Sequence, residues 1–327
     1  MRRFLAAFAA LALAAPAAAQ APAAIPVGRG PCCLAVAGGR LWVGNQRDAS
    51  VQVVDPATNA VHASLQAGPR SSNVRVSGLL DMVAAYGAVW VTNGGTHRLY
   101  RIDASTRAVR SLSIGRYVGG VAAAGRELWV SVDHTALARV DPRRLRVERR
   151  VQLIGRINGY ITSIAAGGGA VWVATDGGDI LKLDATTLRL RAQLRLGRSL
   201  ARSVGVLTGD FYWVVRAGVP TLFRIRAESA KVSARLPIAV GPQRGFPGLA
   251  TGGGSVWLIA DPARVAELDP VTGAERRTLD VPLQDPDASN YVPGTVAVGL
   301  GSTWIASWPG TDGFTDPTRG VVYRFPR

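Results

Sequence analysis

The residues best suited to chemistry in this chain are arginines that recur at one place in a repeated pattern. Each follows a glycine, or a Gly-Pro pair, at the end of an apolar segment. A guanidinium group makes two-point contacts with carboxylates and phosphates, so several of them on one side of a molecule would attract an anionic ligand. The alternative is a set of solvated arginines, because arginine is abundant here and exposed loops gather charge. The six are Arg29, Arg70, Arg116, Arg156, Arg198 and Arg244.

Aromatic residues share the segments that carry these arginines: Tyr117, Tyr160, Phe246 and Tyr291. Aromatic faces beside arginines suit sugars, nucleobases or peptides. They equally suit simple packing at the centre of a molecule. A nucleic-acid partner is disfavoured, because the sequence has neither lysine clusters nor a recognised nucleic-acid motif. We therefore expect a small anionic or carbohydrate ligand, or a protein partner.

Histidine and amide side chains offer a second, weaker set of candidates. His97 and His134 follow apolar-Trp segments and lie next to Asn93 and Asp133, so they could meet on one face or simply be solvated. Asn45 and Asn93 could offer amide oxygens to a hard cation, or could end their strands. We predict no catalytic residue, no metal site and no cofactor, with Ca²⁺ or Mg²⁺ as the ions that such oxygens would suit.

Two adjacent cysteines, Cys32 and Cys33, are the only ones in the chain. In an oxidising compartment they could form a vicinal disulfide, or one could pair with a partner. Neighbouring strand residues normally point to opposite sides, so two reduced thiols are the alternative. The spacing matches neither a metal-binding nor a thioredoxin-type motif.

The elements that must position these residues follow from a repeat of tryptophan. An apolar-Trp-apolar segment recurs every 39 to 48 residues, at Trp42, Trp90, Trp129, Trp172, Trp213, Trp257 and Trp304. This period is that of a four-stranded propeller blade, and seven repeats predict an all-β, seven-bladed propeller. In the first blade we expect strands at 34–36, 41–43, 51–54 and 61–65. A recurring Asp turn should separate the third and fourth strands of most blades, with the carboxylate accepting backbone N–H bonds.

The last blade has sequence for only three strands, at 295–298, 303–306 and 321–325. We expect residues 24–27 to supply the missing outer strand, where Pro26 is tolerated because an edge strand has an unpaired side. Pro237 and Pro282 should likewise fall in outer strands. Residues 71–80 and 286–292 are insertions between an outer strand and the next inner strand. Such connections share one face of a propeller with the loops between second and third strands, so this face is the expected binding surface.

Composition and the N-terminal segment indicate export. Residues 1–19 have the charged start, the apolar run and the A-x-A ending of a Sec-type signal peptide. We expect residues 20–327 to form a single propeller domain in the periplasm or outside the cell, as a monomer without a membrane span. The net charge is +16, and all but two of the 38 basic residues are arginines. A genome rich in G and C or an anionic partner would each account for this bias.

Two families resemble this chain. The segments Ala88-Val89-Trp90-Val91-Thr92-Asn93 and Leu41-Trp42-Val43-Gly44-Asn45, each followed by a strand ending in Asp, resemble the YVTN-type propeller repeat. The region around each Trp is also similar to the streptogramin lyases, a resemblance that implies a metal site built from Glu and His. Here no carboxylate or histidine stands three residues after any repeat Trp, in contrast to the glutamate of those enzymes.

These observations favour an exported, non-catalytic propeller that binds a ligand or partner on the arginine-bearing face. The alternative is a metal-assisted lyase or lactonase that uses Asn45, Asn93, His97, His134 and Asp176. A periplasmic scaffold for a quinoprotein system is a third possibility, which the family resemblance alone implies.

Overall fold

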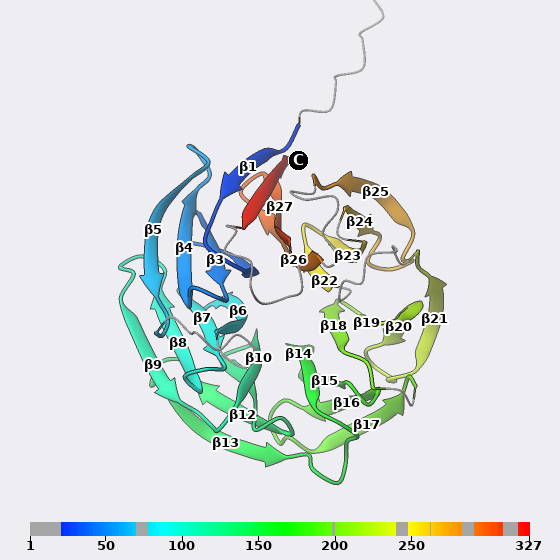
Figure 1. Cartoon of the computed structure of the whole chain (residues 1–327). Coiled ribbons are helices and arrows are strands. Elements are labelled where there is room, and N and C mark those ends of the chain that lie inside the picture. The colour runs from blue at the N-terminus through cyan, green and yellow to red at the C-terminus, as the bar shows by residue number, and fades with distance from the viewer. Residues whose placement is uncertain are drawn as a thin grey trace, which may run out of the picture.

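The structure is a ring of seven four-stranded antiparallel blades, which confirms the predicted fold class (Figure 1). It is a computed structural model that describes residues 21–69, 78–197, 200–239, 248–261, 263–282, 291–309 and 320–327, without the side chains of residues 260, 291–294 and 309. The predicted signal peptide and most of the two insertions lie outside these residues. No helix in the described ranges is long and apolar enough to cross a membrane.

Each blade runs from an inner strand near the axis to an outer strand at the rim. Blade 1 has β2 (Pro31–Ala37), β3 (Arg40–Asn45), β4 (Ser50–Asp55) and β5 (Ala60–Gln66). Blade 2 has β6 (Leu79–Ala85), β7 (Ala88–Asn93), β8 (Arg98–Asp103) and β9 (Val109–Ser113). Blade 3 has β10 (Val118–Ala124), β11 (Glu127–Val132), β12 (Ala136–Asp141) and β13 (Arg146–Gln152). Blade 4 has β14 (Ile161–Gly167), β15 (Ala170–Thr175), β16 (Asp179–Asp184) and β17 (Leu190–Arg195).

The remaining blades follow the same order. Blade 5 has β18 (Ser203–Thr208), β19 (Phe211–Arg216), β20 (Val219–Arg226) and β21 (Val232–Pro237). Blade 6 has β22 (Gly248–Gly252), β23 (Ser255–Asp261), β24 (Arg264–Leu268) and β25 (Glu275–Asp280). Blade 7 has β26 (Tyr291–Gly299), β27 (Ser302–Pro309), β28 (Val321–Pro326) and, as its outer strand, β1 (Ala23–Pro26).

The N-terminal strand closes the ring as predicted. β1 pairs antiparallel with β28, with Ile25 opposite Val322, so the two ends of the chain meet in one blade. Pro26 and Pro237 lie in outer strands, whereas Pro282 falls just after β25. An outer strand ladders on one side only, which leaves room for a residue without an N–H.

The repeated tryptophans are buried between neighbouring blades, and each is at most 1% exposed. Trp42 packs with Met82 and Val89 of the next blade, and Trp304 packs with Leu34 and Leu41 across the closure. Because both faces of a second strand meet another blade, β7 and β15 are buried at every position, while outer strands alternate between more and less exposed residues.

Several indoles are also tied to the first hairpin of their own blade. The Nε1 of Trp90 donates to the carbonyl oxygen of Ala85 at 3.0 Å, and Trp304 makes the same bond to Gly299 at 3.0 Å. Trp42 and Trp257 repeat it with the residue five positions earlier. A buried indole N–H needs an acceptor, and in these four blades the hairpin before the Trp supplies it, whereas Trp213 donates to the carbonyl oxygen of Pro270 in the next blade.

The predicted Asp turns form, and they satisfy local backbone donors. Oδ1 of Asp184 accepts the N–H groups of Thr186 and Thr187 at 2.9 and 2.6 Å, and Asp103, Asp141 and Asp269 repeat the pattern. These bonds favour the charged carboxylate, so they lower the pKa of Asp103, Asp184 and Asp269 well below the usual range. The aspartates therefore hold the turns between third and fourth strands.

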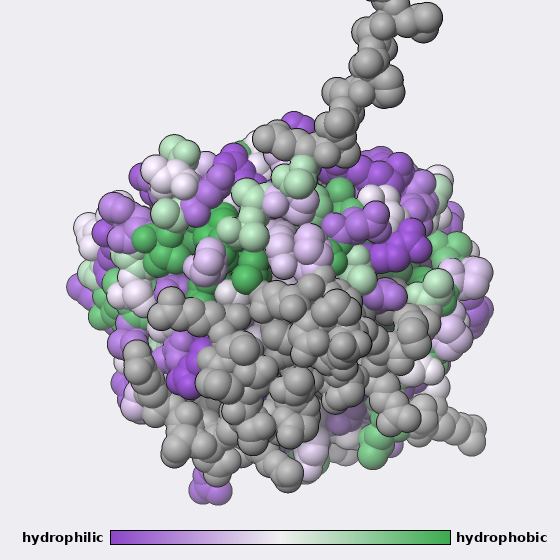
Figure 2. All heavy atoms as spheres, turned by 45° about the horizontal axis from the view of Figure 1, so that its top comes forward, coloured by the Kyte–Doolittle hydropathy of each residue, from purple (hydrophilic) through white to green (hydrophobic). Residues whose placement is uncertain are grey.

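The rim of the ring exposes both hydrophilic and hydrophobic residues. Figure 2 shows hydrophilic residues with small groups of hydrophobic residues between them along the described surface on that side. The apolar residues are therefore concentrated between the blades, where the packing clusters lie.

A Trp in the middle of a blade should be essential to stability. Trp172 is fully buried and stacks on Tyr212 with ring centroids 4.7 Å apart. We expect Trp172→Ala to lower the free energy of unfolding by about 3–5 kcal/mol in urea denaturation. Leu200→Ala is the control, because Leu200 is 77% exposed, and it should change stability by less than about 0.5 kcal/mol. Equal losses in the two variants would contradict this account.

The Asp turns predict a specific response to acid. Because the folded-state pKa values of Asp103, Asp184 and Asp269 are lowered, their contribution to stability is complete above about pH 4 and is lost as the pH falls below it. The triple change to Asn keeps the acceptor oxygen without the charge. Thermal melting between pH 2 and pH 7 should show a shallower acid decline for the triple variant than for the wild type; parallel curves would rule the explanation out.

Candidate functional site

Residues that sequence places far apart meet on the face formed by the outer-to-inner connections and the turns between second and third strands, which we call the loop face. The ring of His134 stacks on Tyr117 with centroids 3.9 Å apart, and lies 4.7 Å from the ring of Tyr160. Tyr117 precedes β10, His134 follows β11 and Tyr160 precedes β14. Three separate loops of blades 2 to 4 therefore build one row of rings.

Two of the three rings in the row are exposed to solvent. His134 and Tyr160 are exposed and Tyr117 is half-buried, with Tyr160 56% exposed. The backbone of His134 has φ 63° and that of Asp133 has φ 51°, a left-handed pair that histidine adopts at some cost. Such strain persists where surrounding contacts hold it, and here the ring stacking is one such contact.

Aspartates in the second-to-third turns position the incoming loops. Asp133 Oδ1 accepts the N–H of Arg116 at 2.6 Å, and Asp176 Oδ1 accepts the N–H of Tyr160 at 2.7 Å. In blade 1, Asp48 Oδ2 accepts the N–H of Arg29 at 2.8 Å. The sequence carries a signal for this role, an Asp four to six residues after the Trp in blades 1, 3 and 4.

The structure describes three of the six predicted arginines, and they differ. Arg29 Nε forms an ion pair with Asp48 Oδ1 at 2.9 Å, so its charge is already matched. Arg116 and Arg156 are exposed, and they belong to the connections that carry Tyr117 and Tyr160. Arg70, Arg198, Arg244 and Phe246 lie outside the described residues, as does the side chain of Tyr291.

The two candidate asparagines face the interior. Asn93 is 1% exposed, and its amide donates to the carbonyl oxygen of Ala67 in the neighbouring blade at 2.6 Å while its Oδ1 accepts the N–H groups of Gly95 and Thr96. Asn45 is fully buried, and its amide contacts Ser50 and Gln52 at 3.2 Å. Both end a second strand and hold the adjoining loops, so the ring row does not include them.

His97 is exposed in the turn after β7, with φ 56°. Within the described ranges, no three side chains of His, Cys, Asp or Glu lie close enough together to hold a metal ion. Asp176, a residue of the metal-assisted alternative, is committed to the Tyr160 backbone.

A charged group near the axis was missed in the sequence. Asp81 lies on β6, Tyr117 precedes β10 and Arg202 precedes β18, yet the charge of Arg202 acts on both Asp81 and Tyr117. Blades 2 and 5 are not neighbours, so Asp81 and Arg202 can approach each other only near the axis of the ring (Figure 1). The signal was available in principle, since Arg202 occupies the same kind of connection as the six arginines.

Burial is the largest influence on the pKa values of Asp81, Tyr117 and Arg202. It raises the pKa of Asp81 to about 6, although the N–H groups of Val121 and Met82, each at 2.8 Å, and the charge of Arg202 act in the other direction. Burial likewise lowers the pKa of Arg202 and raises that of Tyr117.

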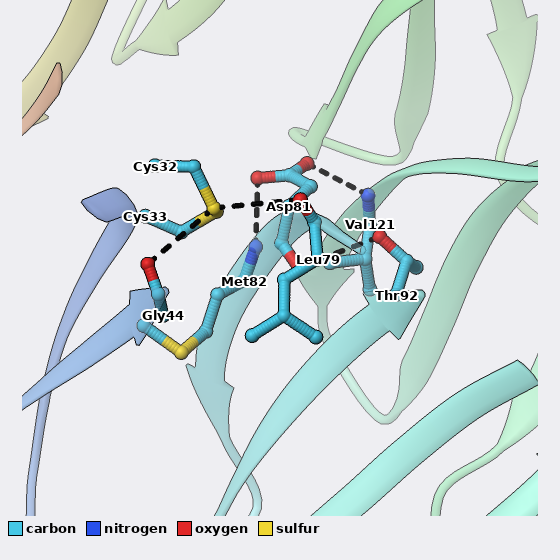
Figure 3. Close-up of a disulfide and its surroundings, with 8 residues drawn as sticks. All are labelled: Cys32, Cys33, Gly44, Leu79, Asp81, Met82, Thr92 and Val121. Carbon is cyan, nitrogen blue, oxygen red and sulfur yellow. Dashed lines mark hydrogen bonds between the residues drawn. A yellow bond between two sulfur atoms is a disulfide. The ribbon is translucent and has the colours of Figure 1, made fainter. Parts of the chain in front are cut away.

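Cys32 and Cys33 lie beside Asp81 at the start of the inner strands (Figure 3), and a disulfide joins them. Cys33 is 4% exposed, whereas Cys32 is partly accessible, with its Sγ 3.5 Å from the carbonyl oxygens of Gly44 and Leu79. A disulfide sulfur has no proton to donate, so these carbonyls would become hydrogen-bond acceptors only for a reduced Cys32.

Comparison with protein-family models and with curated proteins finds no match for the chain. The seven four-stranded blades are consistent with a propeller repeat family, and no match names the YVTN type.

Asp81 gives a pH dependence opposite in sign to that of the turn aspartates. Its raised pKa means that the folded state holds a proton which the unfolded state releases near pH 4, so stability falls as the pH rises from about 4 through 6. We expect Asp81→Asn to remove this decline, improving stability relative to wild type by up to about 3 kcal/mol at pH 7 compared with pH 4. Urea denaturation at both pH values tests this, and a constant difference between the two proteins would refute it.

Proposed function

We propose that this chain is an exported, non-catalytic binding module of the YVTN propeller type, which takes a ligand or a protein partner on its loop face. The row of Tyr117, His134 and Tyr160 carries the proposal. Exposed ring faces held by separate loops of a rigid scaffold are the usual construction of a binding surface. The N-terminal segment, with its charged start and apolar run, supports export.

The charges near the row favour an anionic ligand. Arg116 and Arg156 are exposed there, while the nearby carboxylates of Asp133 and Asp176 accept backbone N–H groups. Asp133 is in addition 3.6 Å from Arg150. An acidic sugar or peptide would place its ring or side chain on the aromatic row and its carboxylate toward the two guanidinium groups.

Nothing in the described geometry favours the lyase or lactonase alternative over a binding role. The candidate ligands of that alternative are used inside the fold, as with Asn45 and Asn93, or pair with backbone donors, as with Asp176. The absence of a metal and of a cofactor, and a monomeric state, stay predictions.

Substitution of the middle ring separates binding from folding. We expect His134→Gly to leave the melting temperature unchanged or slightly raised, because glycine adopts the backbone conformation of this position more readily. Residues 20–327 would be screened by thermal shift against neutral and acidic sugars, nucleosides and short peptides. Ligands that raise the melting temperature of Tyr86→Gly as much as that of the wild type should lose at least tenfold in affinity with His134→Gly, in calorimetry.

A matched control and a charge variant complete the test. Tyr86→Gly removes another exposed aromatic with positive φ, on the opposite face, so a ligand that binds the loop face should keep its affinity in this variant. The pair Arg116→Ser and Arg156→Ser should weaken anionic ligands and reduce the salt dependence of their affinity. If every ligand found binds His134→Gly as well as wild type, the loop face is not the binding surface.

A further inference from the structure

A cavity of about 570 Å³ lies on the face opposite the loop face, between blades 2 and 3. This hairpin face carries the turns between first and second strands and between third and fourth strands. The cavity is lined by Tyr86, by the turn at Asp103 and Thr106, and by the turn from Pro142 to Leu145. Its size is that of a site for a small organic molecule.

Four arginines line the cavity, and three of them lack a carboxylate partner among the described residues. Arg101 pairs with Asp103 at 3.2 Å. Arg110, Arg126 and Arg143 have no acidic side chain within 4.0 Å in the described part of the chain. The three positive charges therefore line the cavity without carboxylate partners to neutralise them.

The acidic residues that adjoin the lining residues Arg126 and Pro142 in the sequence are already engaged. Glu127 pairs with Arg139 at 3.3 Å, and Asp141 pairs with Arg144 at 3.2 Å. Asp103, the only acidic side chain among the described residues that line the cavity, also accepts N–H bonds from its own turn. The cavity thus has four positive charges against one negative charge, and an entering anion would meet guanidinium groups that need a partner.

Tyr86 supplies an aromatic wall at a turn position where blade 7 has Leu300 and the other five blades have glycine. It has φ 55° at the first position of the two-residue turn between first and second strands, and its OH donates to the carbonyl oxygen of Glu127 in the next blade at 2.7 Å. Five other blades have a glycine with positive φ at this position: Gly38, Gly125, Gly168, Gly209 and Gly253. Tyrosine is less suited to this backbone than glycine, so its ring, 37% exposed, distinguishes this junction from its counterparts.

We propose that the cavity between blades 2 and 3 binds a hexose-sized organic anion, with its carboxylate or phosphate on Arg110, Arg126 and Arg143 and its ring on Tyr86. This site is separate from the loop face and does not depend on the function proposed for that face. The oxyanion accounts for the three guanidinium groups, and the sugar ring accounts for the aromatic wall.

Calorimetry of residues 20–327 with glucuronate, glucose 6-phosphate, glucose and sodium sulfate tests the proposal. We expect saturable binding of the first two, no binding of glucose, and sulfate at least tenfold weaker than the better sugar anion. The two sugar anions distinguish a carboxylate from a phosphate as the preferred group. Binding of sulfate as tight as that of both sugar anions, or no saturable binding at all, would overturn the proposal.

Three variants assign the effect to the cavity. Combined Arg110→Ser, Arg126→Ser and Arg143→Ser should reduce affinity for the sugar anions at least tenfold. Combined Arg149→Ser, Arg189→Ser and Arg235→Ser removes the same net charge from exposed outer-strand or turn positions that do not line the cavity, and should change affinity less than twofold. Equal losses in the two triple variants would show a general charge effect and contradict a site.

Tyr86→Gly tests the aromatic wall without endangering the fold, because it restores the residue that five other blades use in this turn. We expect an unchanged melting temperature and a several-fold loss for the sugar anions, with sulfate binding unaffected. Unchanged sugar binding in this variant would refute the ring contact. The sugar-anion binding that Tyr86→Gly weakens should be unchanged in His134→Gly, so failure at one face remains distinguishable from failure at the other.

Discussion

The burial of one indole per blade against the neighbouring blade is the constraint on which the structure depends. A large ring placed at the middle of each second strand fixes how far apart adjacent blades stand, and interiors packed at crystal-like density tolerate little change in that spacing. Where the indole N–H reaches back to the first hairpin, as in Trp90 and Trp304, the same residue also sets the turn. Loops from different blades can then meet reproducibly, as the rings of Tyr117, His134 and Tyr160 do.

The arginine excess divides into roles that composition alone does not separate. Arg101 and Arg324, in third strands, and Arg327, at the end of the described chain, lie over blade tryptophans at 5.0 to 5.9 Å, where the positive charge meets the face of the indole. Lys182 takes the same place over Trp172. Many guanidinium groups thus belong to the packing of the blades, and the charge available for a ligand is concentrated where such partners are lacking.

The architecture could be predicted from sequence because its signal is local and repeated. The period of the tryptophans, the Asp turns and the three-stranded remainder at the C-terminus each follow from short segments, and β1 completes the last blade as expected. For the candidate site, the sequence predicts which face of the ring carries it, but not how its individual side chains are oriented. Whether Asn93 points outward or ties two loops together depends on the register of a neighbouring blade, which no short segment specifies.

The charged groups near the axis were even less predictable from short segments of sequence. Asp81 and Arg202 are more than a hundred residues apart and interact only because the ring brings blades 2 and 5 together. The Asp48, Asp133 and Asp176 contacts were within reach of a sequence argument, since each follows its Trp at short range. Their targets were not, because the accepting oxygen and the donating N–H belong to different turns.

Ring closure has a consequence for the order of assembly. β1 is the first strand to be synthesised and its partner β28 is the last, so the seventh blade cannot be completed before the whole polypeptide exists. Until then, a nascent chain carries one unmatched strand at its beginning and an incomplete sheet at its end, each a possible template for a wrong neighbour. Contacts of such long sequence separation slow folding. The pairing of β1 with β28 is therefore the step that completes the ring.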